Sequence, residues 1–143
     1  MKRSKRLRVV AELAERKVRA AVSALQQSNR KLEQTRYSED LLSSSHRSHI
    51  EHIEQRLTRG SSAYDLKVLS QSAQNLEKGL DQIANRIHQA ESEHAARKQE
   101  WLAQRAKHQA IERVIERRAD EEASYARRLA ERAVDDTIST RRS

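Results

Sequence analysis

The chain has 143 residues, of which 36% are hydrophobic and 35% charged, with two glycines, no proline, no cysteine and a net charge of +8. This composition excludes a sheet, which needs turn residues, and it excludes disulfides and thiolate metal sites. Ala, Glu, Lys, Leu and Arg make up about half of the chain, as in long helices and coiled coils. We therefore expect an all-α protein with a narrow apolar seam between paired helices.

Residues 1–8 form a basic N-terminal segment with five positive side chains and no acidic one. These are Lys2, Arg3, Lys5, Arg6 and Arg8. From Glu12 onward acids and bases alternate, as on the solvated face of a helix. We interpret residues 1–8 as a tail that is disordered or docks electrostatically on an acidic protein surface, with nucleic acid a less favoured partner.

The first helix is predicted over residues 9–58 from an apolar stripe with alternating spacings of three and four. The stripe comprises Leu7, Ala11, Ala14, Val18, Ala21, Leu25, Ser28, Leu32, Thr35, Glu39 and Leu42. Beyond Leu42 we expect it to drift onto Ile50, Ile53 and Leu57, as happens when a 3.6-residue period replaces a 3.5-residue one.

A turn is predicted at residues 59–62. Gly60 can adopt positive φ, and Ser62 with Asp65 resembles a capping box that starts a second helix over residues 63–138. Residues 139–143 are predicted to be a C-terminal tail.

The second helix carries an apolar stripe on Leu66, Leu69, Ala73, Leu76, Leu80, Ile83, Ile87 and Ala90, and the same frame later reaches Trp101, Ile111, Ile115, Tyr125 and Leu129. Polar residues interrupt this distal part of the stripe, namely His94, Arg97, Gln104, His108, Arg118 and Glu122. They predict looser pairing there, or a surface reserved for a partner.

The predicted fold is one domain over residues 1–143, an antiparallel coiled-coil hairpin in which the longer second helix overhangs by about 25 residues. No run of ~18 apolar residues and no export signal is visible, so a soluble cytoplasmic protein is expected.

The sequence gives little support for chemistry. Gly60 and Gly79 are isolated, so no glycine-rich phosphate loop exists, and we expect neither catalysis nor a cofactor. His46, His49 and His52 have spacings at which a helix could present a zinc or nickel site, but solvated histidines are the favoured interpretation. Glu91 and His94 form a single Glu-x-x-His, a motif that di-iron bundles need twice.

Four segments resemble the flagellar export protein FliJ family. They are Arg6–Glu15, Gln74–Gln82, Glu100-Trp101 with the basic run from Leu102 to Arg118, and Ala130–Asp136. The resemblance spans nearly the whole chain. It implies a two-helix antiparallel coiled coil that acts as a stalk in the hexameric export ATPase.

The resemblance also implies binding to the cytoplasmic domain of the export gate and to export chaperones, at the periphery of the inner membrane. For the gate surface, Leu42 and Leu76 match the family pattern, and Gly79 replaces another small residue. Ser45, His49 and Ser72 stand near positions where the family has aromatic residues, and Ile83 stands where it has a histidine.

Three alternatives remain open from the sequence. The first is the corresponding stalk of a virulence-type injectisome, which has the same architecture. The second is a nucleic-acid-associated helical hairpin, which the net charge of +8 would favour. The third is a metal-binding helical bundle that uses His46 and His49. No small-molecule substrate and no membrane insertion are expected.

Overall fold

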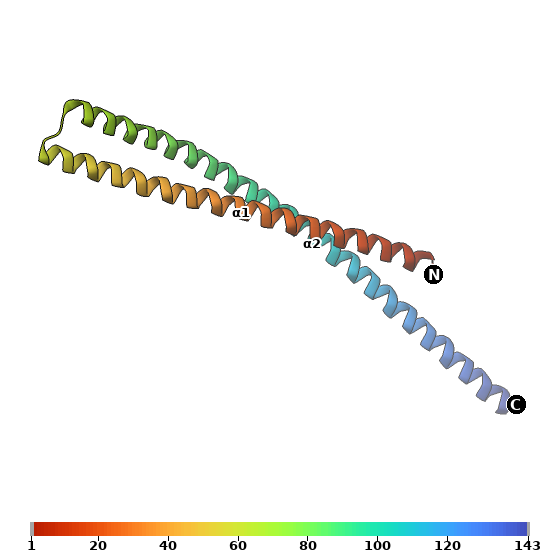
Figure 1. Ribbon diagram of the computed structural model, residues 1–143. Coiled ribbons are helices and arrows are strands. Elements are labelled where there is room, and N and C mark those ends of the chain that lie inside the picture. Colours follow the sequence, from red (N-terminus) through yellow and green to blue (C-terminus); the bar gives the residue numbers. More distant parts are fainter. Residues whose placement is uncertain (1, 143) are drawn as a thin grey trace. The chain divides into compact units, whose positions relative to one another are not determined.

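The computed structural model describes the backbone of residues 2–142 and the side chains of residues 3–142 (Figure 1). It consists of α1 (Lys2–Arg59) and α2 (Ala63–Arg142), which pack against each other in an antiparallel hairpin. The predicted all-α fold is therefore confirmed. The side chain of Lys2, one of the predicted docking residues, lies outside the described residues.

Both helices extend further than the sequence analysis expected. The segments interpreted as tails, 1–8 and 139–143, are helical from Lys2 and as far as Arg142. Arg and Lys are good helix formers, and neither segment contains a proline or glycine that would end a helix. Arg141 and Arg142 also lie in the last turn of α2, where positive charge is stabilised by the helix dipole.

The turn follows the predicted chemistry. Gly60 has a φ of 74°, in the left-handed region that favours glycine. The Asp65 backbone N–H donates to Ser62 Oγ at 3.1 Å, and the Leu66 backbone N–H donates to the Ser62 carbonyl oxygen at 3.1 Å. Ser62 is therefore the N-cap of α2.

The contacts between α1 and α2 divide the chain into two compact units, each built from both helices. One unit comprises Val22–Glu100 and contains the turn; the other comprises the residues up to Ala21 together with those from Trp101 onward. The single domain expected from the sequence stays a prediction.

In the Val22–Glu100 unit the helices pack through the heptad positions, here called the seam. Its buried residues are Ser28, Leu32, Ala73, Ile83 and Ala90. The predicted drift beyond Leu42 was wrong for Ile50 and Leu57, which are 36% and 60% exposed, whereas Ile53 is half-buried as expected. The strict spacing continues from Leu42 through the half-buried His46 and His49 to Ile53. Supercoiling keeps the 3.5-residue period, so it brings two histidines onto the seam.

In the second unit, Ala14 and Ala21 of α1 are buried, and Trp101, His108, Ile111 and Ile115 of α2 are half-buried. Small residues on one helix leave room for large ones on the other. The predicted stripe loses its burial after Ile115, and every residue from 125 to 142 is exposed. Within residues 2–142, neither helix contains a stretch apolar enough to cross a membrane.

Candidate functional site

Of the three residues expected at a gate-binding surface, Leu42 and Leu76 lie on the seam of the Val22–Glu100 unit, and Gly79 lies beside it. A β-carbon built on Gly79 would lie 3.7 Å from Leu42 Cδ1, so these two residues pack together across the helices. Leu42, Leu76 and Gly79 are each half-buried, and the neighbouring Leu41 is 53% exposed. These four residues are here called the leucine patch: Leu42, Leu76 and Gly79 are partly covered by helix pairing, and Leu41 adds exposed apolar surface.

A polar contact borders the leucine patch. His46, one turn after Leu42, places Nε2 3.3 Å from Glu77 Oε1 on the opposite helix. On the next turn, His49 Nδ1 lies 3.1 Å from the Ser45 carbonyl oxygen. Because a carbonyl oxygen only accepts, the Nδ1 atom of His49 carries the donated proton.

The interpretation of the three histidines as solvated was wrong for two of them. His46 and His49 are half-buried on the seam because the heptad spacing continues past Leu42, whereas His52 is exposed. Among residues 2–142 no group of three His, Asp or Glu side chains is placed to hold a metal ion. Glu91 and His94 point to different partners, since Glu91 pairs with Arg36 at 3.3 Å.

At the positions where the sequence departs from the family pattern, the environments differ. Ser45 is exposed, Ser72 is half-buried, and Ile83 is 8% exposed in the core. Ile83 therefore contributes to helix pairing. Near Leu42, serine and histidine stand where the family has aromatic residues.

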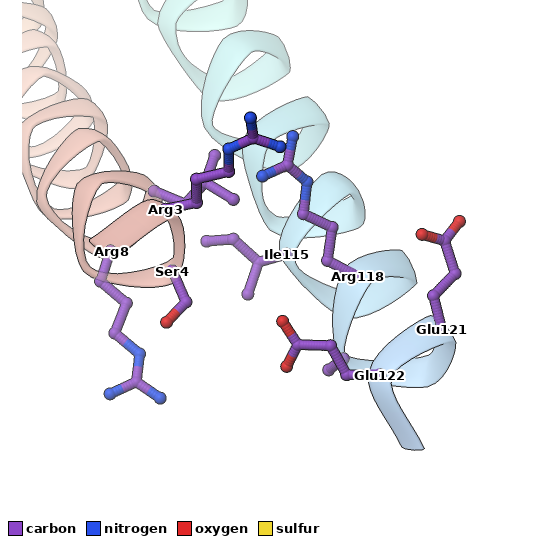
Figure 2. A pocket seen from close by; sticks show the side chains of 9 residues that line it. Arg3, Ser4, Arg8, Ile115, Arg118, Glu121 and Glu122 are labelled. Atoms are coloured by element: carbon purple, nitrogen blue, oxygen red, sulfur yellow. The ribbon is translucent and has the colours of Figure 1, made fainter. Parts of the chain in front are cut away.

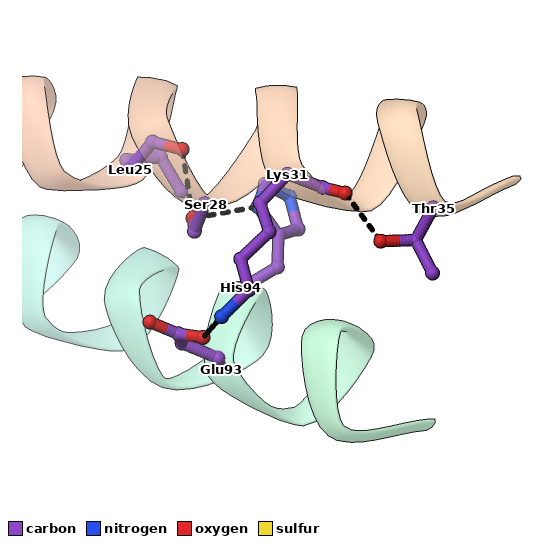
Figure 3. A network of polar contacts seen from close by, with 6 residues as sticks. All are labelled: Leu25, Ser28, Lys31, Thr35, Glu93 and His94. Atoms are coloured by element: carbon purple, nitrogen blue, oxygen red, sulfur yellow. Dashed lines mark hydrogen bonds and ion pairs between the residues drawn. The ribbon is translucent and has the colours of Figure 1, made fainter. Parts of the chain in front are cut away.

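A polar pair crosses the seam farther from the turn (Figure 3). Ser28 is 5% exposed, and its hydroxyl donates to the Leu25 carbonyl oxygen at 2.8 Å. A hydroxyl has one proton, so Ser28 Oγ must accept at its second contact, with His94 Nδ1 donating at 3.2 Å. The exposed pair Lys31–Glu93, at 3.4 Å, lies beside it. The sequence predicts that Ser28 and His94 each lie at a heptad position of its helix. Only the nearly equal number of residues between each of them and the turn indicates that they meet.

The N-terminal basic residues border a cavity of about 460 Å³, here called the N-terminal notch (Figure 2). It is lined by Arg3, Ser4, Leu7 and Arg8 from α1 and by Ile115, Arg118, Ala119, Glu121 and Glu122 from α2. Leu7 and Ile115 are half-buried and supply its apolar part. Arg3, Arg8 and Arg118 supply positive charge, and Glu121 and Glu122 supply negative charge (Figure 2). Lys5 and Arg6 are exposed and do not line it.

The sequence does not predict this notch, because its α2 residues lie in the part of the second helix that is expected to overhang. The spacing on α1 brings Arg3 and Arg8 to it and directs Lys5 and Arg6 elsewhere. In the same unit, the Arg105 guanidinium lies 5.4 Å from the centre of the half-buried Trp101 ring, a cation–π contact between successive turns of α2.

Two long helices, a seam of small and aliphatic residues and a single turn define an antiparallel coiled-coil protein. The model of the family described as the flagellar FliJ protein matches residues 3–143, and the chain belongs to this family. It is therefore a flagellar protein associated with protein export. Neither the curated proteins nor the solved structures contain a match to the chain.

Proposed function

We propose that this protein is a non-enzymatic coiled-coil stalk of the flagellar type III export apparatus. It binds the hexameric export ATPase and the cytoplasmic domain of the export gate, and it escorts export chaperones. Its place is the cytoplasm, peripheral to the inner-membrane export apparatus. The observation that carries the proposal is the family match over residues 3–143, which favours the flagellar system over the injectisome.

A stalk of this kind acts through differential binding. A helical hairpin that contacts one conformation of a ring subunit more tightly than another shifts the subunit toward the first conformation, without itself performing chemistry. The residues that bind the ring should then include apolar side chains, which give affinity, and charged side chains, which favour one orientation of the partner.

The N-terminal notch supports the ATPase contact. Arg3, Arg8 and Arg118 line the notch together with Glu121 and Glu122, around the apolar Leu7 and Ile115. The notch can therefore accept an apolar side chain with a carboxylate beside the arginines and a basic group beside the two glutamates. Arginine also forms bidentate contacts with carboxylates, which gives orientation as well as attraction.

The leucine patch supports the gate contact. Gly79 leaves part of Leu42 accessible, and Leu41 adds exposed apolar surface beside it. A partner that docks there needs an apolar surface of its own, because His46 and Glu77 at the border are already paired with each other.

The ATPase contact is tested with the purified export ATPase by measuring ring assembly, turnover and co-elution on a sizing column. The wild-type protein should co-elute and raise turnover. Arg3→Glu/Arg8→Glu should weaken co-elution about tenfold, and more salt should weaken the wild-type contact. Arg16→Glu/Lys17→Glu changes the net charge equally at exposed positions outside the notch and should behave as wild type. Absence of co-elution together with unchanged turnover would remove the stalk role.

The gate contact is tested by titrating the isolated cytoplasmic domain of the gate with two variants. Gly79→Glu places a charged side chain against Leu42 and should weaken binding, whereas Ser44→Glu, at an exposed position on the same helix as Leu42, should not. Circular dichroism checks that both variants stay helical. Equal binding by Gly79→Glu and the wild type would exclude the leucine patch.

A further inference from the structure

In the unit built from the residues up to Ala21 and from Trp101 onward, the residues that directly precede the pairing positions share one pattern on both helices. On each helix the order is base, apolar, apolar, base. These residues, here called the basic face, are Arg6, Val10, Leu13 and Lys17 on α1 and Lys107, Ala110, Val114 and Arg117 on α2. All of them are exposed, and Val10, Leu13 and Val114 are 46%, 52% and 40% exposed.

The antiparallel pairing puts the two halves of the basic face on the same side of the hairpin. The ion pairs between α1 and α2 show the rule. Lys31 and Glu93 each directly precede a pairing position, and they meet at 3.4 Å. Arg36 and Glu91 each directly follow one, and they meet at 3.3 Å on the other side. Residues that precede pairing positions on α1 therefore share a side with those that precede them on α2.

The bases stand at the two ends of the basic face, with the aliphatic side chains between them. Leu7 and Ile115 both line the N-terminal notch, so the two helices are level with each other there. Bases from both helices thus lie at the notch end of the face, and bases from both helices lie at its other end. The first pair is Arg6 with Arg117, and the second is Lys17 with Lys107. On α1 the face spans about 16 Å.

The acids of the same stretches lie on the opposite side. In residues 3–20 and 103–117 each acid directly follows a pairing position, and these acids are Glu12, Glu15, Glu112 and Glu116. Glu15 pairs with Arg19 of its own helix at 2.7 Å. Within residues 3–142, the four bases of the basic face take part in no ion pair. The face therefore combines exposed aliphatic surface with positive charge that the chain itself leaves uncompensated.

This combination fits an anionic lipid surface. Aliphatic side chains enter the boundary between headgroups and acyl chains, and the bases around them attract the anionic headgroups. Nucleic acid would use the bases but not the aliphatic residues, and the face has no aromatic side chain on which a nucleobase could stack. The core of a protein interface is likewise enriched in aromatic residues, which the face lacks.

We propose that the basic face binds the surface of a membrane rich in anionic phospholipid, with the hairpin lying on the surface and not crossing it. None of its residues lines the N-terminal notch or belongs to the leucine patch. The lipid contact therefore needs neither the export ATPase nor the gate, and loss of either protein contact would leave it intact.

Vesicle sedimentation tests the proposal with the full chain and no other protein. One set of vesicles contains equal parts of phosphatidylglycerol and phosphatidylcholine, and the other contains phosphatidylcholine alone. The wild type should sediment with the first set and stay in solution with the second, and more salt should weaken its binding. A wild type that stays in solution with the anionic vesicles at low salt would overturn the proposal.

Charge reversal locates the contact. Lys17→Glu/Lys107→Glu should weaken binding to the anionic vesicles about tenfold or more, because each base near an anionic surface adds attraction. Lys5→Glu/Arg113→Glu changes the net charge equally at exposed positions off the face, and it should bind within about twofold of the wild type. Equal loss in both variants would mean that net charge, and not the basic face, governs the binding.

Apolar substitutions separate a lipid from other polyanions. Leu13→Gln/Val114→Gln keeps the charge and should bind the anionic vesicles about tenfold more weakly, since fewer aliphatic groups leave water. Val9→Gln/Leu102→Gln alters side chains off the face that are 63% and 40% exposed, and it should bind as the wild type does. Circular dichroism checks that all four variants stay helical.

Binding to duplex DNA, measured with the same proteins, provides the comparison. If Leu13→Gln/Val114→Gln bound the anionic vesicles as tightly as the wild type, the contact would be one of charge alone. Duplex DNA bound more tightly than the vesicles would then identify nucleic acid as the partner, and the lipid proposal would fail.

Discussion

Ser28 and His94 meet across the seam, where Ser28 Oγ and His94 Nδ1 are 3.2 Å apart and the serine is 5% exposed. Each polar group lies at a heptad position that would otherwise be apolar. A pair of this kind favours the one register in which both groups are satisfied, at some cost in stability compared with an apolar pair.

Substitutions at this pair should not be additive. Ser28→Ala leaves the His94 N–H half-buried without its acceptor and should lower the free energy of unfolding by about 1 kcal/mol. Ser28→Ala/His94→Leu removes both polar groups and should recover or exceed wild-type stability. Urea unfolding followed by circular dichroism gives both values; a double variant less stable than Ser28→Ala would contradict the pairing.

Gly79→Ala should stabilise the protein. The added β-carbon would meet Leu42 Cδ1 at 3.7 Å, an ordinary van der Waals contact, and alanine replaces the least favourable non-proline helix residue. We expect a gain of about 0.5–1 kcal/mol in the free energy of unfolding, visible as a higher Tm. A lower Tm would mean that the helices approach more closely at this position than the structure has them.

Gly60→Ala should destabilise the hairpin through the backbone alone. At a φ of 74° a β-carbon meets no atom within 4 Å, so its cost is conformational and amounts to about 1 kcal/mol. Gly60→Asn should cost less, because asparagine tolerates the left-handed region. Thermal unfolding of the two variants checks this order, and equal stability of alanine, asparagine and glycine would refute it.

Ser62→Ala should cost about 1 kcal/mol, since it removes the acceptor for the Asp65 N–H at 3.1 Å. Ser62→Asp should retain the cap. Ser61→Ala is the matched control, because among the described residues the Ser61 hydroxyl is buried without a partner, and its loss should be neutral or stabilising. If the two alanine variants were equally unstable, the cap would have no role in the turn.

The sequence predicts those features that local periodicity or turn chemistry determines. The all-α hairpin, the cap at Ser62, the glycine at positive φ and the seam through Leu42 all follow from the chain. The exposure of Ile50 and Leu57 does not follow from the sequence. A heptad stripe drifts around a straight helix by only about 20° per heptad relative to a supercoiled one, so the two cases predict nearly the same residues. Only helix pairing decides which period holds, and here it places His46 and His49 on the seam.

The candidate sites were predictable in part. Leu42, Leu76 and Gly79 were selected by resemblance, and the contact of Leu42 with Gly79 depends on a register that the sequence does not state. The same limit applies to Ser28 with His94. The sequence does not predict the N-terminal notch, because its residues come from opposite ends of the chain and residues 1–8 have the composition of a charged tail.

The proposed stalk function depends on the pairing of α1 with α2, and one distance measures this pairing most directly. Because the chain has no cysteine, Lys31→Cys/Glu93→Cys introduces a unique pair of sites for spin labels. In the structure, Lys31 Nζ and Glu93 Oε2 are 3.4 Å apart across the two helices. Paired helices, with axes about 8–10 Å apart, predict a narrow label separation of about 20 Å. A separation near 90 Å, which the intervening residues would span as one continuous helix, would contradict the account.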